Sequence, residues 1–259
     1  MNDKMSLHTH CFRCKHSQGN ATDYAKAAVE RGMKVLGMSD HVPLPDDWWP
    51  GIRMHISEME DYLAEIEAAR AAYPMLKILS GFECDYFPEY EEFFRYLSKR
   101  TDYLIGSVHA VMWRGRKTSV YEIPHTAKAL YTYADLYCQA MASGLFRFMA
   151  HPDLFSILID RWDSDCDAIS KQIMEAALKC DATIEINANG FRRALRELDR
   201  AMHYPIPEFW AWAGEYGVKV VVNSDAHFPH EVNADMDLGF QMVGKFGLRL
   251  DPDLSPDML

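Results

Sequence analysis

Short apolar runs alternate with longer amphipathic stretches along most of this sequence, and this alternation limits the possible folds more than any other feature. Several of the runs are rich in β-branched residues, as buried strands of a parallel sheet are. They cover residues 4–7, 34–38, 76–81, 103–107, 146–149, 182–187 and 218–223. Because strands that alternate with helices form parallel sheets, seven such units predict a closed α/β barrel, one unit short of the usual eight. An open doubly wound sheet is the alternative.

The stretches between the runs have the three- and four-residue spacing of amphipathic helices. The clearest covers residues 57–73, where Ser57 and Glu60 predict a capping box at the start. A second covers residues 22–31 and ends at Gly32, which suits a helix terminus. Further helices are predicted near residues 89–99, 126–143, 166–179, 206–216 and 235–246.

Composition and charge exclude several functional classes. The 259 residues are 49% hydrophobic, enough for a large core, and carry a formal net charge of −11. An acidic surface argues against nucleic acid or an anionic membrane as the main partner. No apolar run approaches the length of a membrane span, and residues 1–10 contain no signal-peptide core, so neither feature is expected. The sequence leaves the oligomeric state open.

The six cysteines are too few and too scattered for a secreted disulfide scaffold. We therefore expect reduced thiols and a cytoplasmic protein. Cys11 and Cys14 form one Cys-x-x-Cys pair, which could be a zinc or redox motif, although no second pair follows it.

Side chains that bind metals follow almost every apolar run. Since the carboxyl ends of parallel barrel strands share one face, these side chains should meet at one mouth. Any one of them alone is more often an ordinary polar loop residue. Seven of the eleven histidines at one mouth, however, would be costly to desolvate without a bound cation. The set therefore predicts a multinuclear metal site formed by His8, His10, His16, His41, Glu83, His109, His151, Asp225 and His227.

The donor types narrow the choice of metal. Imidazole and carboxylate without a dedicated thiolate suit zinc, iron(II) or manganese. Nine donors exceed the four of a closed tetrahedral site, and they fit two or three divalent ions with open positions for water and substrate. Glu83, near the middle of the set, is the best candidate for a carboxylate that bridges two ions. The remaining histidines are expected on the surface or in loops: His55, His125, His203 and His230.

The candidate ligands lie in a series of short motifs that spans residues 6 to about 231. The series resembles that of the PHP (polymerase and histidinol phosphatase) superfamily, and within it the histidinol-phosphatase branch. The motifs are His8-Thr-His10, Cys14-Lys-His16, Asp40-His41-Val-Pro, Gly81-Phe-Glu83-Cys-Asp85, Gly106-Ser-Val-His109, Ala-His151-Pro-Asp153, Asn187-Ala-Asn-Gly-Phe-Arg192-Arg193 and Ser224-Asp225-Ala-His227. The residues at 188 and 189, and a long segment at 194–203, depart from the branch pattern and bear on the identity of the substrate.

The resemblance implies a distorted (β/α)7 TIM-like barrel that spans residues 1–259 as a single domain and holds three metals. It also implies a phosphoric monoester hydrolase, a histidinol-phosphatase of histidine biosynthesis, which converts L-histidinol phosphate to L-histidinol and phosphate. By the same analogy, His8, His10, Glu83 and Asp225 would hold one metal, Glu83, His109 and His151 a second, and His16, His41 and His227 the third.

For the reaction, we hypothesise that a metal-bound hydroxide held by Glu83, Asp225 and His227 attacks phosphorus in line. Coordination to a metal lowers the pKa of water from 15.7 to about 7, so such a nucleophile exists at neutral pH. The metals would also neutralise the phosphate oxygens.

The substrate should be held by charged residues beyond the ligands. Arg192, Arg193 and Arg53 are candidates for a bidentate grip on the phosphate. Histidinol carries an ammonium and an imidazole group, both of which suit acidic and aromatic neighbours. The candidates for that end of the substrate are Asp85, Asp153, Trp48 and Trp49.

Three other functions are consistent with parts of the pattern. Another phosphoesterase of the superfamily could act on nucleotide, sugar or protein phosphates, and substrate profiling would distinguish it. A non-catalytic metal-binding module of a polymerase is disfavoured by the net charge of −11 and by a chain that ends at Leu259 without an attached domain. An unrelated amidohydrolase barrel would need a lysine ligand, and none follows an apolar run.

Overall fold

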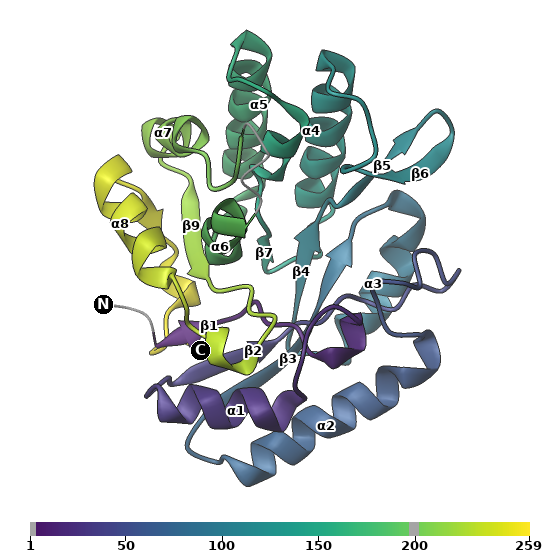
Figure 1. The fold of residues 1–259 in the computed structure, drawn as a ribbon, viewed down its shortest axis with the longest axis vertical. Coiled ribbons are helices and arrows are strands. Elements are labelled where there is room, and N and C mark those ends of the chain that lie inside the picture. Colours follow the sequence, from purple (N-terminus) through teal and green to yellow (C-terminus); the bar gives the residue numbers. More distant parts are fainter. Residues whose placement is uncertain (1–3, 197–201) are drawn as a thin grey trace.

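Eight parallel strands form one curled sheet, and their order in space follows their order in the chain (Figure 1). The computed structural model describes residues 4–196 and 202–259. The sheet order is β1-β2-β3-β4-β7-β8-β9-β10. The strands are β1 (Met5–Ser6), β2 (Val35–Met38), β3 (Lys77–Asp85), β4 (Tyr103–Ser107), β7 (Phe148–Met149), β8 (Thr183–Asn187), β9 (Lys219–Asn223) and β10 (Arg249–Leu250). The first seven of these coincide with the seven predicted runs.

The sheet curls until β1 meets the segment that follows β9. Thr9 pairs in parallel with Ala226, and the backbone N–H of His10 donates to the Ala226 carbonyl at 2.9 Å. At the opposite end of β9, Lys219 and Val220 pair with β10 instead. Seven strands therefore join into a barrel at their carboxyl ends, and β10 is added at the amino end. The predicted barrel is confirmed, and the open doubly wound alternative is wrong.

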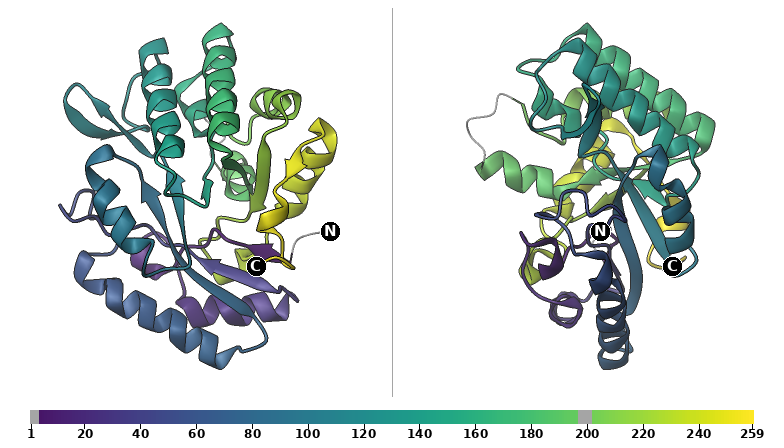
Figure 2. Two further views of the ribbon diagram at one scale, coloured as in Figure 1. Left: turned by 180° about the vertical axis from the view of Figure 1, so that it is seen from behind. Right: turned by 90° about the vertical axis from the view of Figure 1, so that its right-hand side faces the viewer.

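Helices cover the outer side of the curl in all three views (Figures 1 and 2). They are α1 (Ala21–Glu30), α2 (Met59–Ala72), α3 (Glu91–Leu97), α4 (Ala127–Ala142), α5 (Ser164–Cys180), α7 (Pro207–Tyr216) and α8 (Met236–Phe246), whereas α6 (Ala188–Arg196) lies at the barrel mouth. Their apolar faces pack on the outward side chains of the strands and form the larger core. No described helix is long and apolar enough to cross a membrane.

The start of α2 differs from the prediction. A 3-10 turn, Ile56–Glu58, precedes the helix, so the chain begins to coil earlier than the apolar spacing indicates. The capping box is therefore formed by His55, which accepts from the Ser57 N–H, and by Glu58, which accepts from the His55 N–H. The predicted box of Ser57 and Glu60 is wrong.

Two elements near the barrel mouth were not predicted. One is an antiparallel hairpin of β5 (Ala110–Trp113) and β6 (Arg116–Ser119). The other is α6, which follows β8 without an intervening loop. Its Gly190 packs so closely against Tyr204 that a Cβ would lie 2.4 Å from the Tyr204 carbonyl oxygen. Close packing thus requires glycine at this position. Because glycine is a poor helix former, the residues of α6 do not look helical in the sequence. Within the unusual 194–203 segment, residues 197–201 lie outside the described part of the chain.

The inside of the barrel changes from apolar to polar along its axis. At the amino ends of the strands, inward side chains form a small second core that includes Val35, Tyr103, Phe148 and Val221. Towards the carboxyl ends, the inward positions hold buried polar groups: Glu83, Glu185, Asn187 and Asn223. The apolar layer thereby supports a polar layer directly beneath the mouth.

Candidate active site

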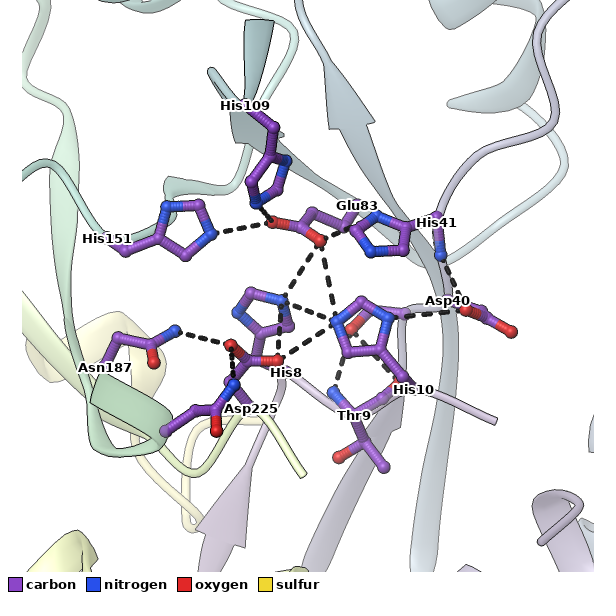
Figure 3. Close-up of polar contacts among 12 residues, drawn as sticks. His8, Thr9, His10, Asp40, His41, Glu83, His109, His151, Asn187 and Asp225 are labelled. Carbon is purple, nitrogen blue, oxygen red and sulfur yellow. Dashed lines mark hydrogen bonds and ion pairs between the residues drawn. The ribbon is translucent and has the colours of Figure 1, made fainter. Parts of the chain in front are cut away.

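All nine predicted ligands lie together at the carboxyl ends of the strands. Figure 3 labels seven of them, which converge from six different segments of the chain. His8 is fully buried beneath the others. The remaining eight line a cavity of about 570 Å³ that opens at the barrel mouth. Among the described residues, five groups of three donors have their ligand atoms within 4.8 Å of one another, as a metal site requires.

The first cluster of donors joins the His-x-His pair to two carboxyl groups. The Nε2 atoms of His8 and His10 are 3.2 Å apart. The Nε2 atom of His10 lies 3.1 Å from Asp225 Oδ1 and 3.5 Å from Glu83 Oε2. The Nε2 atom of His8 lies 3.6 Å and 3.5 Å from the same two oxygens. Four potential ligand atoms therefore point to one place.

The opposite nitrogens of these two rings are engaged elsewhere. His8 Nδ1 lies 2.8 Å from Glu185, and His10 Nδ1 lies 3.3 Å from Asp40. When each Nδ1 carries a proton for its carboxylate, each Nε2 is an acceptor only. Two such nitrogens and two carboxylate oxygens then face one another without a proton between them. A cation bound between these acceptor atoms would offset their mutual repulsion, so the cluster fits a metal ion.

The second cluster lies around the other oxygen of Glu83. Glu83 Oε1 is 2.9 Å from Nε2 of His151 and 3.6 Å from Nε2 of His109. Behind the His109 ring, Nδ1 lies 2.9 Å from Asp85. Glu83 thus presents one oxygen to each cluster, as Figure 3 shows. The geometry suits a carboxylate that bridges two ions.

The third predicted set is assembled less tightly. The His16 ring lies 5.4 Å from the His41 ring and 5.0 Å from the His227 ring, measured between centroids. Within the described ranges, no group of donors within 4.8 Å contains all three of these histidines. The structure instead groups His227 with His10 and Cys14, and His41 with His10 and Glu83.

Protonation in the cluster follows from burial and from neighbouring charges. Burial alone would raise the pKa of Glu83, but the surrounding histidines hold it well below its ordinary value. Burial, together with the nearby His10, lowers the pKa of His41 to about 4. Burial also favours a lower pKa at His10, but its contacts with Asp225 and Asp40 outweigh burial and raise it to about 9. The acids therefore attract positive charge to this position, as they would attract a metal.

Two further observations fit bound metal. The buried atoms His41 Nδ1, His151 Nδ1 and Asp225 Oδ1 form no well-oriented hydrogen bond, although His41 Nδ1 lies 3.1 Å from Glu83 and Asp225 Oδ1 lies 3.1 Å from His10. His151 and Asp225 also have positive φ angles, 28° and 50°, which non-glycine residues adopt at a cost. Strained backbone that delivers buried ligand atoms into one cavity is typical of a functional site.

Two of the three predicted phosphate-binding arginines lie away from the cavity. Arg53 is 1% exposed and is held by Asp85 at 2.7 Å and by the Val42 carbonyl at 3.0 Å. Arg192 donates to the backbone carbonyls of Ser224 at 2.6 Å and Ala234 at 3.0 Å. The structure therefore does not bring either guanidinium group to the cavity, because acceptors on neighbouring loops already bind both.

Arg193 does line the cavity, and Arg196 lies beside it. The two are three residues apart on α6, so they project from the same side of the helix. Arg196 was missed because the sequence predicts no helix between residues 179 and 206, and a spacing of three residues places two side chains on one side only in a helix. The hydroxyl of Tyr121 accepts from Arg193, which places an additional hydrogen-bonding group at this wall.

The two acids expected to bind the organic part of the substrate also have partners within the protein. Asp85 accepts from the backbone N–H of His109 at 3.0 Å and pairs with Arg53. Asp153 is fully buried and accepts from the backbone of Ile206 and from Trp210, each at 2.8 Å. The predicted roles for both acids are therefore wrong. Of the two tryptophans, Trp49 lines the cavity, together with Ile52, Tyr204 and Phe228, whereas Trp48 packs on Phe87.

A parallel barrel with histidines and carboxylates clustered at its carboxyl end has the architecture of a metal-dependent hydrolase. The PHP domain family matches residues 6–189, and the chain belongs to that family. A protein of Deinococcus radiodurans named "Probable histidinol-phosphatase" is 30% identical over 87% of this chain and 86% of its own length.

Solved structures share the fold. HisK of Listeria monocytogenes aligns with a TM-score of 0.77 and 20% identity, over 91% of this chain and 99% of its own. The histidinol phosphate phosphatase of Lactococcus lactis, solved with zinc, L-histidinol and phosphate, aligns with a TM-score of 0.75 and 16% identity, over 96% and 95%. The ligand roles of individual residues in the present chain stay predictions.

Proposed function

We propose that this protein is a metal-dependent phosphatase that hydrolyses L-histidinol phosphate to L-histidinol and phosphate. The observation that carries the proposal is the convergence of nine histidine and carboxylate donors on a cavity that also has an arginine wall. The histidinol-phosphatase name of the Deinococcus radiodurans relative supports the substrate. So does the shared fold with the Lactococcus lactis enzyme that was solved with L-histidinol and phosphate. A cytoplasmic location stays a prediction.

We assign the donors to two or three zinc, iron or manganese ions. His8, His10, Glu83 and Asp225 would hold the first ion, since the Nε2 atom of each histidine lies within 3.6 Å of an oxygen of each carboxyl group. Glu83, His109 and His151 would hold the second, and His16, His41 and His227 the third. When bound, such ions would neutralise phosphate oxygens and lower the pKa of water.

The protein's own side chains orient the substrate. The guanidinium groups of Arg193 and Arg196 would bind phosphate oxygens, for which a planar bidentate donor is well suited. Asp85 and Asp153 already accept hydrogen bonds from other parts of the protein. The imidazole and ammonium groups of histidinol would therefore contact the aromatic side chains that line the cavity. Trp49 offers a ring face to a cationic group at the cavity wall, and such contacts are worth about 0.5–2 kcal/mol.

Steady-state kinetics on three substrates test the proposal. We expect kcat/KM for L-histidinol phosphate to exceed that for a sugar phosphate and for a nucleoside monophosphate. A pocket matched to one organic group discriminates against others by its unfilled contacts. Equal kcat/KM for all three substrates would instead identify a phosphatase of broad specificity.

A further inference from the structure

Glu185 is a buried carboxyl group directly beneath the donor clusters. It projects inward from β8 and has no exposed surface. Its oxygens receive four hydrogen bonds. Oε1 lies 2.8 Å from His8 Nδ1 and 3.0 Å from Asn223 Nδ2. Oε2 lies 3.2 Å from the backbone nitrogen of His151 and 2.8 Å from Asn187 Nδ2. Three of these partners are N–H donors, and a carboxylate oxygen only accepts, so Nδ1 is the nitrogen of His8 that should carry the proton.

The contact with His8 fixes the chemical form of that ring. A neutral imidazole carries one proton, and the nitrogen opposite that proton is the one that can bind a metal. Glu185 accepts at Nδ1, so Nε2 is the free nitrogen. That nitrogen is the one that faces Glu83 and Asp225. Glu185 therefore determines which nitrogen His8 presents to the first cluster.

The contact with His151 holds a different part of the site. The backbone N–H of His151 donates to Oε2 of Glu185, at the residue whose φ angle is 28°. This hydrogen bond offsets part of the cost of that conformation, which aims the His151 ring at Glu83 in the second cluster. Asn187 adds a third link, because its amide donates to Asp225 at 3.1 Å as well as to Glu185.

We infer that Glu185 is a positioning residue that sets both metal positions at once, by fixing the tautomer of His8 and the backbone of His151. The inference rests on the proposed function in taking these two histidines as ligands. Asp40 and Asp85 each contact only one donor of the first two clusters, His10 and His109 respectively. Asp40 also accepts from the backbone N–H of His41, which belongs to the third predicted set.

The test compares Glu185→Gln with Thr183→Val. Glutamine keeps the shape but replaces one acceptor oxygen by a donor NH₂, so at least one of the four bonds becomes a clash of donors. If the NH₂ faces His8, the ring proton must move to Nε2, which then cannot bind metal. Thr183 points inward from the same strand, two residues earlier, and bonds to Asp251 far from the donors. Its replacement removes a buried hydrogen bond without touching either cluster.

Zn²⁺ affinities are measured for each ion by competition with a chelator, without substrate. Outer carboxylates of this kind typically contribute 10- to 100-fold to metal affinity. We expect Glu185→Gln to lower the affinity for two of the ions by at least tenfold. Thr183→Val should leave the affinity for both ions unchanged. The inference would be overturned if the folded Glu185→Gln variant bound both ions with wild-type affinity. It would also be overturned if the affinity for only one ion fell. Failure of the wild-type protein to bind Zn²⁺ would refute the proposed metal site itself.

A second measurement does not depend on folding of the variant. A long-range ¹H–¹⁵N correlation spectrum of the zinc-loaded wild-type protein reports which nitrogen of His8 carries the proton. A proton on Nδ1 supports the inference. A proton on Nε2 contradicts it, because Glu185 then does not select the metal-binding nitrogen.

Discussion

The donors at the strand ends and the wall around them are held in different ways. Each donor of the first two clusters follows or ends a strand, and several are fixed from behind by a buried carboxyl group, as His8 is by Glu185. The cavity wall is formed by α6, by Tyr121 just after the β5–β6 hairpin and by the loop that carries Trp49. The hairpin supports this wall, and these segments contact one another mainly through charges and rings. We therefore expect the strand ends to form a rigid centre for chemistry and the wall to select the substrate. Changes in the centre should abolish the reaction, whereas changes in the wall should alter substrate binding.

Removal of the metals should have the largest effect. After exhaustive chelation we expect no measurable turnover and a lower Tm, because a ligand bound only by the folded state stabilises it by roughly 3–4 kcal/mol at 100 to 1,000 times its Kd. Elemental analysis by mass spectrometry should find two to three ions per chain before chelation. Zn²⁺, Fe²⁺ or Mn²⁺ should restore turnover. A fully active preparation with less than one ion per chain would refute the metal centre.

Glu83→Gln should lower kcat by roughly a thousandfold, since it removes the one anion shared by both clusters. Circular dichroism should remain that of the wild type, because the helices pack on the outer face of the barrel. Glu92→Gln, a matched change on the exposed face of α3, should have no effect. Wild-type turnover by Glu83→Gln with full metal content would contradict the bridging role.

The adjacent arginines of α6 separate the two regions most directly. Arg193→Ala should reduce kcat/KM by about a hundredfold, because a charged donor to phosphate is lost from the cavity wall. Its free energy of unfolding should change little. Arg192→Ala should instead lower that free energy by about 2 kcal/mol, since the carbonyls of Ser224 and Ala234 lose a charged donor.

Urea unfolding and kinetics on the same samples distinguish these two outcomes. If Arg192→Ala impaired substrate binding as much as Arg193→Ala without loss of stability, the assignment of the two residues would have to be reversed.

The same contrast explains what the sequence could predict. A donor that follows a buried apolar run, such as His151 or Asp225, can be placed because all carboxyl ends of a parallel barrel share one face. Arg196 could not be placed, because its position depends on α6. That helix was not predicted, since tight packing on Tyr204 requires glycine, a poor helix former, at position 190. Asp85 was noticed but assigned to the substrate. Its engagement with His109 and Arg53 depends on contacts between distant segments, which local spacing does not reveal.

The smallest effect is expected at Lys117, which connects the hairpin to the loop that carries Trp48 and Trp49. Its Nζ atom lies 2.9 Å from Asp46 and 3.1 Å from Glu89, and 5.8 Å from the centre of the Trp48 ring. Both acids are about half exposed, so solvent screens these ion pairs and each is worth at most about 1 kcal/mol. Lys117→Met should therefore lower the Tm by only a few degrees.

Its kinetic effect should be selective. A looser contact between hairpin and loop leaves the strand ends in place, so kcat should stay at the wild-type value while KM for L-histidinol phosphate rises a few-fold. Lys99→Met, at an exposed position after α3, is the matched control and should change neither constant. A fall in kcat with unchanged KM in Lys117→Met would show that the hairpin and loop act on the chemical centre. In that case the division between a rigid centre and a selective wall would not hold.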